Sequence, residues 1–238
     1  MSGHSKWHNI QATKGKADAA RGKVFTKIGR EIAVAVKMGG ADINTNSKLY
    51  DVVQKAKQNN MPNDSIQRSI KKAAGEGPNE NYTPITYEGY GPYGVAFIVE
   101  CLTDNKNRTA SDVRHLFDKF GGNLGTDGSV SYLFEYKGVV VVAKKDLTED
   151  DVMMVALDSG ADDVQTEDEA FIVYCATDKV HDVSKAFEAA GMTVEQAEAD
   201  YVPFNYMELT ESQQETIGKL TDALDDLDDV QNVYNNMG

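Results

Sequence analysis

The sequence is poor in the residues that build disulfide-stapled, secreted or membrane-embedded proteins. It has two cysteines in 238 residues, Cys101 and Cys175, and each lies in an apolar stretch typical of a strand. We expect buried free thiols, although a disulfide stays open as an alternative. The longest aliphatic run, Val139–Val142, is too short to cross a bilayer, and the opening MSGHSKWHNI is too polar for a signal peptide. These absences predict a cytoplasmic protein with no membrane partner.

Patterns for catalysis, nucleotide binding and metal binding are also missing. Gly89–Gly94 matches G-x-G-x-x-G, but a predicted strand follows it and Pro92 stands in its middle, so the pattern favours a turn over a dinucleotide site. Gly121–Gly128 lacks the Lys-Ser/Thr pair of a P-loop. His4 and His8 are four residues apart but have no further candidate ligand nearby. We therefore expect no enzyme, no metal site and no cofactor.

What the sequence does have is a sharp segregation of charge. Residues 1–80 carry a net charge of +7 and residues 81–238 carry −21, which together give the −14 of the whole chain. A soluble protein that concentrates cations in one module usually presents them to a polyanion. The alternative is that the basic and acidic parts attract each other inside the molecule. We interpret the acidic runs, Asp225-Asp226 and Asp228-Asp229 among them, as solvated helix ends and turns.

The first third of the chain has the pattern of a small helical module. Apolar residues at helical spacing predict a helix from about Ala17 to Met38, which Gly39-Gly40 ends. A second predicted helix begins after Asn46 or Ser47, and Asp64 is a candidate cap for a third. Residues 75–79 are rich in glycine and polar residues and predict a linker.

After the linker the period changes to that of strands. Residues 83–88 and 95–103 predict a hairpin, followed by a helix that ends at Gly121-Gly122 and a strand over 129–135. Residues 137–201 then have the order strand–helix–strand–strand–helix–strand, with strands near 138–143, 162–167, 170–176 and 193–201. This order is typical of a ferredoxin-like unit. A helix near 211–227 and a strand near 229–234 complete a second unit of similar order from the flanking segments.

The expected fold class is therefore α+β and multidomain. A three-helix module is followed by two ferredoxin-like α+β domains, one inserted in the other. The boundaries that we expect are 1–77 for the basic helical domain, 78–135 plus 204–238 for one α+β domain, and 136–203 for the inserted one.

Five cations share one face of the opening helix. They are Lys16, Lys23, Lys27, Arg30 and Lys37. At 100° per residue they fall within roughly an 80° sector, opposite the apolar stripe, and extend over roughly 32 Å of helix. This density suits a phosphate backbone. The preceding arm adds basic residues around the only tryptophan, which can stack on a base or fold back onto the bundle. The candidate nucleic-acid contacts are Lys6, Trp7, His8, Lys14, Lys16, Arg21, Lys23, Lys27, Arg30 and Lys37. An ordinary solvated lysine-rich face is the alternative for the helix.

Several strings of residues resemble one family over nearly the whole chain, the YebC/PmpR family. Two positions depart from its pattern: Ile43, where relatives usually have Pro, and Tyr93, which is often Gly; both are local changes. The matching strings are Ser2-Gly3-His4-Ser5-Lys6-Trp7, Phe25-Thr26-Lys27, Asn59-Asn60-Met61-Pro62, Tyr87-Glu88-Gly89-Tyr90-Gly91-Pro92 and Gly121–Val130.

The resemblance implies a three-domain cytoplasmic protein that regulates gene expression. Relatives are named as probable DNA-binding transcriptional regulators, whereas other members are described as ribosome-associated factors that help translation through difficult stretches such as consecutive prolines. Both functions need a surface that binds a polyanion, either DNA or ribosomal RNA, so charge alone does not choose between them. A third interpretation is an adaptor whose α+β domains bind proteins or small ligands. The sequence does not indicate the oligomeric state.

Overall fold

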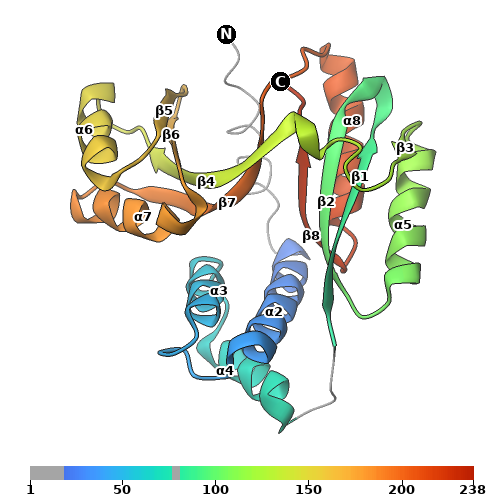
Figure 1. Cartoon of the computed structure of the whole chain (residues 1–238), viewed down its shortest axis with the longest axis horizontal. Helices are drawn as coiled ribbons and strands as arrows, with labels where there is room; N and C mark the ends of the chain where they lie inside the picture. The colour runs from blue at the N-terminus through green and yellow to red at the C-terminus, as the bar shows by residue number, and fades with distance from the viewer. Residues whose placement is uncertain (1–18, 77–80) are drawn as a thin grey trace. The chain divides into compact units, whose positions relative to one another are not determined.

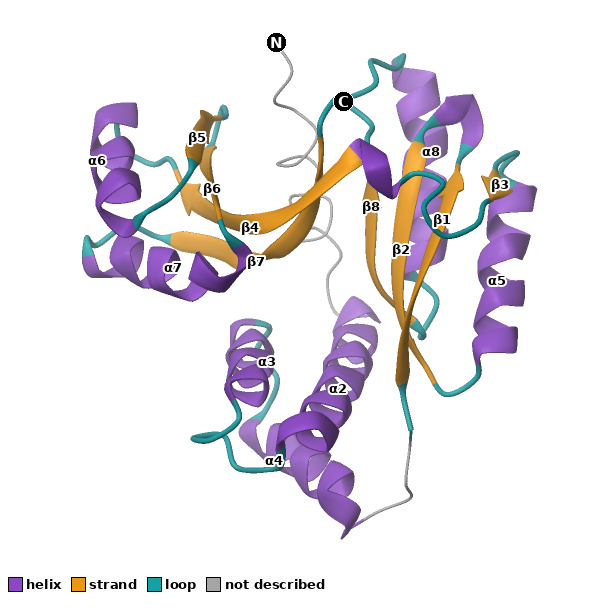
Figure 2. Cartoon of the chain, viewed as in Figure 1, coloured by secondary structure: helices purple, strands orange, loops and turns teal. Residues whose placement is uncertain are grey.

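The computed structural model describes residues 19–76 and 81–238, which fall into two compact units (Figure 1). One unit contains the described residues up to Val130 together with Thr210–Asn235, and the other contains Ser131–Leu209 with Asn236–Gly238. The units hold separate four-stranded antiparallel sheets together with seven described α-helices (Figure 2). The predicted α+β multidomain class is therefore confirmed, whereas the finer division into three domains stays a prediction.

Three helices form the start of the first unit: α2 (Ala19–Gly39), α3 (Ser47–Gln58) and α4 (Asn63–Lys71). The side chain of Asn46 caps α3 by accepting a hydrogen bond from the Leu49 amide, so of the two starts left open after Asn46 or Ser47 the helix takes the first. The cap expected at Asp64 is wrong. Pro62 is the N-cap of α4, and Asp64 lies in the first turn, where its negative charge suits the helix dipole.

The apolar core of this helical module is built entirely from residues of its own helices and the turns between them. The buried residues are Ile28, Ile32, Ala35, Val36, Leu49, Val52, Val53, Ala56, Met61, Ile66 and Ile70. In α2, Ile28, Ile32 and Ala35 repeat at the spacing of one helix face, which places the cations of α2 on other sides.

The rest of the first unit is a sheet with two helices. The sheet has the order β3-β1-β2-β8, with β1 (Thr83–Tyr90), β2 (Ala96–Thr103), β3 (Asn123–Leu124) and β8 (Val230–Asn235). The helices are α5 (Lys106–Lys119) and α8 (Glu211–Asp225). Phe97 of β2 meets Phe117 of α5 edge to face, with ring centroids 5.7 Å apart.

The glycine pattern at 89–94 forms the end of β1 and the turn that leads to β2, and the expected turn is confirmed. Pro92–Gly94 makes one turn of 3-10 helix, and no α-helix follows before β2. Gly91 lies so close to Phe97 that a Cβ atom there would come within 2.6 Å of the phenylalanine ring. The glycines therefore serve a tight turn against the core.

The second unit has ferredoxin-like topology. Its sheet order is β5-β6-β4-β7, with β4 (Phe134–Ala143), β5 (Asp163–Thr166), β6 (Ala170–Cys175) and β7 (Val194–Pro203). Helices α6 (Glu149–Ser159) and α7 (Val180–Ala189) pack against one face through a shared apolar cluster. Thr148 and Asp151 form the capping box of α6.

One predicted pair of strands is wrong. The sequence predicts separate strands over 129–135 and 138–143, but the structure has a short 3-10 turn at Ser131–Leu133 followed by the single strand β4. Gly138 lies inside that strand. The position requires glycine because a Cβ atom there would come within 2.6 Å of the Cys175 sulfur. This glycine permits close packing of the chain and does not end the strand.

Both cysteines are free and buried, as expected. Burial raises the pKa of the Cys101 thiol to about 12. None of the helices within the described residues is long and apolar enough to cross a membrane.

Candidate nucleic-acid interface on helix α2

The basic face of α2 is occupied by carboxylates of the same chain. Lys23, Lys27 and Arg30 follow one another at the i, i+4 and i+7 positions of α2. Each pairs with an aspartate of residues 225–229, which run from the last residue of α8 to the start of β8 and which we call the aspartate turn. The alternative of an ordinary solvated face is therefore wrong for these three cations, and their predicted phosphate contacts stay a prediction.

The three pairs differ in how far they are exposed to solvent. Lys23 Nζ lies 2.8 Å from Asp226 Oδ1, and these side chains are 46% and 73% exposed. Lys27 Nζ lies 2.6 Å from Asp225 Oδ1, with exposures of 13% and 49%. Arg30 Nη1 lies 2.5 Å from Asp229 Oδ1, with exposures of 12% and 8%. The contact therefore grades from a solvated edge at Lys23 to a buried centre at Asp229.

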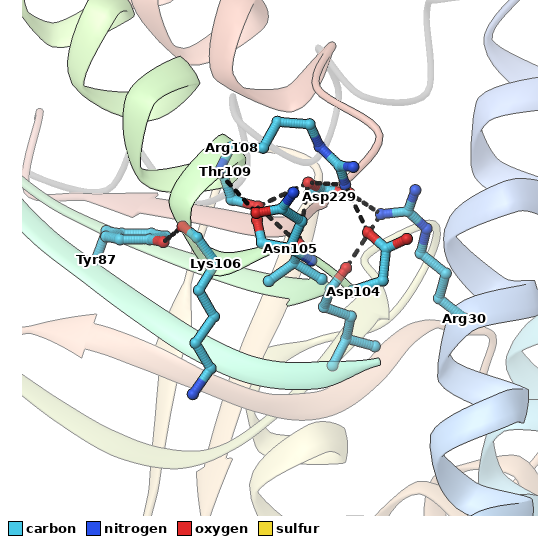
Figure 3. A network of polar contacts seen from close by, with 10 residues as sticks. Arg30, Tyr87, Asp104, Asn105, Lys106, Arg108, Thr109 and Asp229 are labelled. Carbon is cyan, nitrogen blue, oxygen red and sulfur yellow. Dashed lines mark hydrogen bonds and ion pairs between the residues drawn. The ribbon is translucent and has the colours of Figure 1, made fainter. Parts of the chain in front are cut away.

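Asp229 is the centre of a polar network (Figure 3). Its carboxylate accepts hydrogen bonds from Arg30 of α2, from Arg108 of α5 and from the hydroxyls of Thr103 and Thr109. Burial alone would raise the pKa of Asp229. The hydrogen bonds from Arg108, Thr109 and Arg30 outweigh that effect and hold the pKa below its ordinary value of 3.8. Asp229 is therefore an ionised carboxylate that holds α2, α5 and β2 together through its hydrogen bonds. The interpretation of this acidic run as wholly solvated is wrong.

Arg30 makes two further contacts besides the one with Asp229. It donates a hydrogen bond of 3.0 Å from Nη1 to the carbonyl oxygen of Leu102, and its guanidinium lies 5.1 Å from the centre of the Tyr82 ring. The bond between Asp229 and Arg108 raises the pKa of the Arg108 guanidinium. Arg108 and the aspartates of the turn are the functional candidates that sequence reasoning missed.

The other predicted contacts have different outcomes. Lys37 is exposed, and its ammonium donates to the side-chain oxygen of Asn81 at 2.6 Å. Arg21 belongs to α2, but its side chain lies outside the described part of the structure. Five predicted contacts lie outside the described residues altogether: Lys6, Trp7, His8, Lys14 and Lys16.

A second group of cations lies on the other helices of the module. Lys57 of α3 and Arg68 and Lys71 of α4 are exposed, and within the described residues none of the three forms an ion pair. We call these three the α3–α4 basic surface. Lys55, by contrast, pairs with Glu31 of α2 at 3.0 Å. The spacing of Arg68 and Lys71 at i and i+3 was a usable signal for this surface.

Within residues 19–76 and 81–238, no group of three or more His, Cys, Asp or Glu side chains is arranged to hold a metal ion.

Comparison with known proteins places the whole architecture in one family. The model described as "TACO1/YebC protein N-terminal domain" matches residues 5–76, and the model described as "TACO1/YebC second and third domain" matches residues 82–237. The chain belongs to the TACO1/YebC family. The resemblance noted in the sequence is thereby confirmed.

Relatives within the TACO1/YebC family align with nearly the full chain. A protein of Clostridium botulinum (strain Okra / Type B1) is 56% identical, with 99% of this chain and 96% of the relative covered. One from Acetivibrio thermocellus is 57% identical, with 99% and 98% covered. Both carry the name "Probable transcriptional regulatory protein". The crystal structure of a conserved hypothetical protein from Aquifex aeolicus matches with a TM-score of 0.84 and 43% identity, and the match covers 94% of this chain and 93% of that one.

Proposed function

We propose that this chain is a non-catalytic regulator of gene expression that binds the phosphate backbone of duplex DNA through the cationic face of α2. The observation that carries the proposal is the set of three ion pairs along that face. Lys23, Lys27 and Arg30 each hold an anionic oxygen at hydrogen-bonding distance. A carboxylate oxygen and a phosphate oxygen make the same kind of charge-assisted bond to an ammonium or a guanidinium.

The family relationship supports a regulatory role. The relatives above are named probable transcriptional regulatory proteins, and regulation of transcription usually requires contact with DNA. The excess of cations in residues 1–80 supports the helical module as the part that makes this contact. The predicted contacts Lys6, Trp7, His8, Lys14, Lys16, Arg21 and Lys37 remain part of the proposal.

The chemistry of the α2 face favours recognition of the backbone over recognition of bases. Where lysine and arginine side chains contact phosphates, they neutralise charge and fix the position of the protein without reading sequence. No Asn or Gln, the side chains that pair with adenine edges, lies among the residues of α2. We therefore expect binding that depends strongly on salt and weakly on DNA sequence.

The test measures binding of a short labelled DNA duplex to the full chain by fluorescence anisotropy over a series of salt concentrations. The test variant is Lys23→Gln with Lys27→Gln. Replacement by Glu is unsuitable because it would place carboxylates against Asp225 and Asp226. We expect the affinity to fall by about tenfold at low salt and the log–log salt slope to become shallower by about 0.9 for each lost contact.

The matched control is Lys106→Gln with Lys185→Gln, which removes the same charge from exposed positions outside α2. Equal affinities of the two double variants would contradict the proposal. A single-stranded RNA of the same length is measured in parallel. Much tighter binding to RNA, with a slope of about −0.7 per contact, would replace DNA by RNA as the partner.

A further inference from the structure

Ion pairs and hydrogen bonds join α2 to the aspartate turn. The apolar core of the helical module contains no residue of α8, β8 or the turn between them. The described contacts from Lys23, Lys27 and Arg30 to this turn are ion pairs and hydrogen bonds, including a bond of 3.3 Å from the Lys23 ammonium to the carbonyl oxygen of Asp226. The exposed pair of Lys23 with Asp226 weakens with salt and exchanges readily for other anions. The pair of Arg30 with Asp229 is buried and is screened much less.

The position of the carboxylates is unfavourable for α8 itself. Asp225 is the last residue of α8 and Asp226 is its C-cap, and the last turn of this helix contains no basic residue. The C-terminal end of a helix carries partial negative charge, so carboxylates there are destabilising unless a cation is close. Lys23 and Lys27 supply those cations. The two elements are thus electrostatically matched to each other.

The buried centre of the contact can lose Arg30 without leaving a carboxylate unpaired. Asp229 keeps Arg108, at 2.8 Å, and the hydroxyl of Thr109, at 2.7 Å, whether or not Arg30 is present. Thr103 also remains within hydrogen-bonding distance of the same carboxylate. Arg30, once released, is a guanidinium that can hold a phosphate. Both arrangements of the network therefore satisfy Asp229.

We propose that the aspartate turn is an intramolecular competitor for the basic face of α2, which nucleic acid has to displace before Lys23, Lys27 and Arg30 can hold phosphates. This inference rests on the proposed function and adds its regulation. In the ion-paired arrangement of the structure, the carboxylates of Asp225, Asp226 and Asp229 bind the cations that phosphate oxygens would otherwise bind. Weak, adventitious polyanion binding is suppressed, and only a ligand that engages the whole face replaces all three.

The experiment neutralises the exposed half of the aspartate turn in the full chain with Asp225→Asn and Asp226→Asn. We call this double variant the turn variant. These changes keep the shape of the side chains and remove negative charge from the end of α8, so the fold is retained. The control is Asp150→Asn with Asp158→Asn on the exposed side of α6, which changes the net charge equally. We expect the turn variant to bind a labelled DNA duplex about five- to tenfold more tightly than the control at low salt. Its salt slope should also be steeper than that of the unmodified chain, because salt no longer helps to open the contact.

The outcomes separate this inference from the proposed function. If the turn variant binds no more tightly than the control, while Lys23→Gln with Lys27→Gln still weakens binding, the competitor role is overturned and the function stands. If neither the unmodified chain nor any variant binds DNA or RNA, both proposals fail. If the turn variant binds DNA more tightly than the control variant does, the result supports both the competitor role and the proposed function.

Discussion

Two basic regions of the helical module have opposite environments. Lys23, Lys27 and Arg30 of α2 are paired with aspartates some 200 residues further along the chain. The α3–α4 basic surface of Lys57, Arg68 and Lys71 is solvated. Both regions have similar charge in the sequence. The difference shows that the charge of a helix face in the sequence does not indicate whether the chain's own carboxylates neutralise it. The alternative of internal attraction, which the sequence left open, describes the α2 face correctly.

The largest expected effect comes from removing the buried anchor of the paired region. Asp229→Ala leaves two guanidinium groups and two threonine hydroxyls around a missing carboxylate. Breaking a buried ion pair by removing one partner typically costs about 3–5 kcal/mol. We expect a loss of this order in the free energy of unfolding, measured by urea denaturation with circular dichroism. Asp226→Ala is the control, and its exposed pair predicts a loss of about 1 kcal/mol or less. Similar losses in both variants would show that Asp229 is not the anchor.

The sequence predicted the elements of this comparison but not their contact. Local signals were sufficient for the C-terminal end of α2, for the region where α3 begins and for the order of strands and helices in the ferredoxin-like unit, because neighbours in sequence determine them. The partner of Lys27 is 198 residues away, and no local pattern in α2 or in the aspartate turn selects it. The predicted break between the strands over 129–135 and 138–143 was wrong for a similar reason, since the atoms that require a glycine at 138 belong to the distant residues Cys175 and Val180.

Acid should weaken the paired region selectively. The pKa of Asp229 in the folded protein lies below its ordinary value of 3.8, so its contribution to stability is fully present above that value. The contribution is lost as the pH falls from 3.8 through the lower folded pKa, because the carboxylate then takes up a proton. We expect the melting temperature of the unmodified protein to fall more steeply between about pH 5 and pH 2 than that of Asp229→Asn. Parallel profiles for the two proteins would mean that Asp229 does not dominate the acid response.

The smallest expected effect compares one lysine from each region. Lys23→Ala removes an exposed ion pair with Asp226, and Lys57→Ala removes a solvated lysine without an ion pair among the described residues. Exposed pairs contribute about 0.2–1 kcal/mol, and salt screens them. We therefore expect Lys23→Ala to be less stable than Lys57→Ala by about 0.5 kcal/mol at low salt, with the difference vanishing near 0.5 M salt. Urea denaturation at the two salt concentrations measures this. A difference that persists at high salt would mean that Lys23 stabilises the module by packing its methylene chain, and the contact with the aspartate turn would then be less readily displaced by a polyanion than its exposed charges indicate.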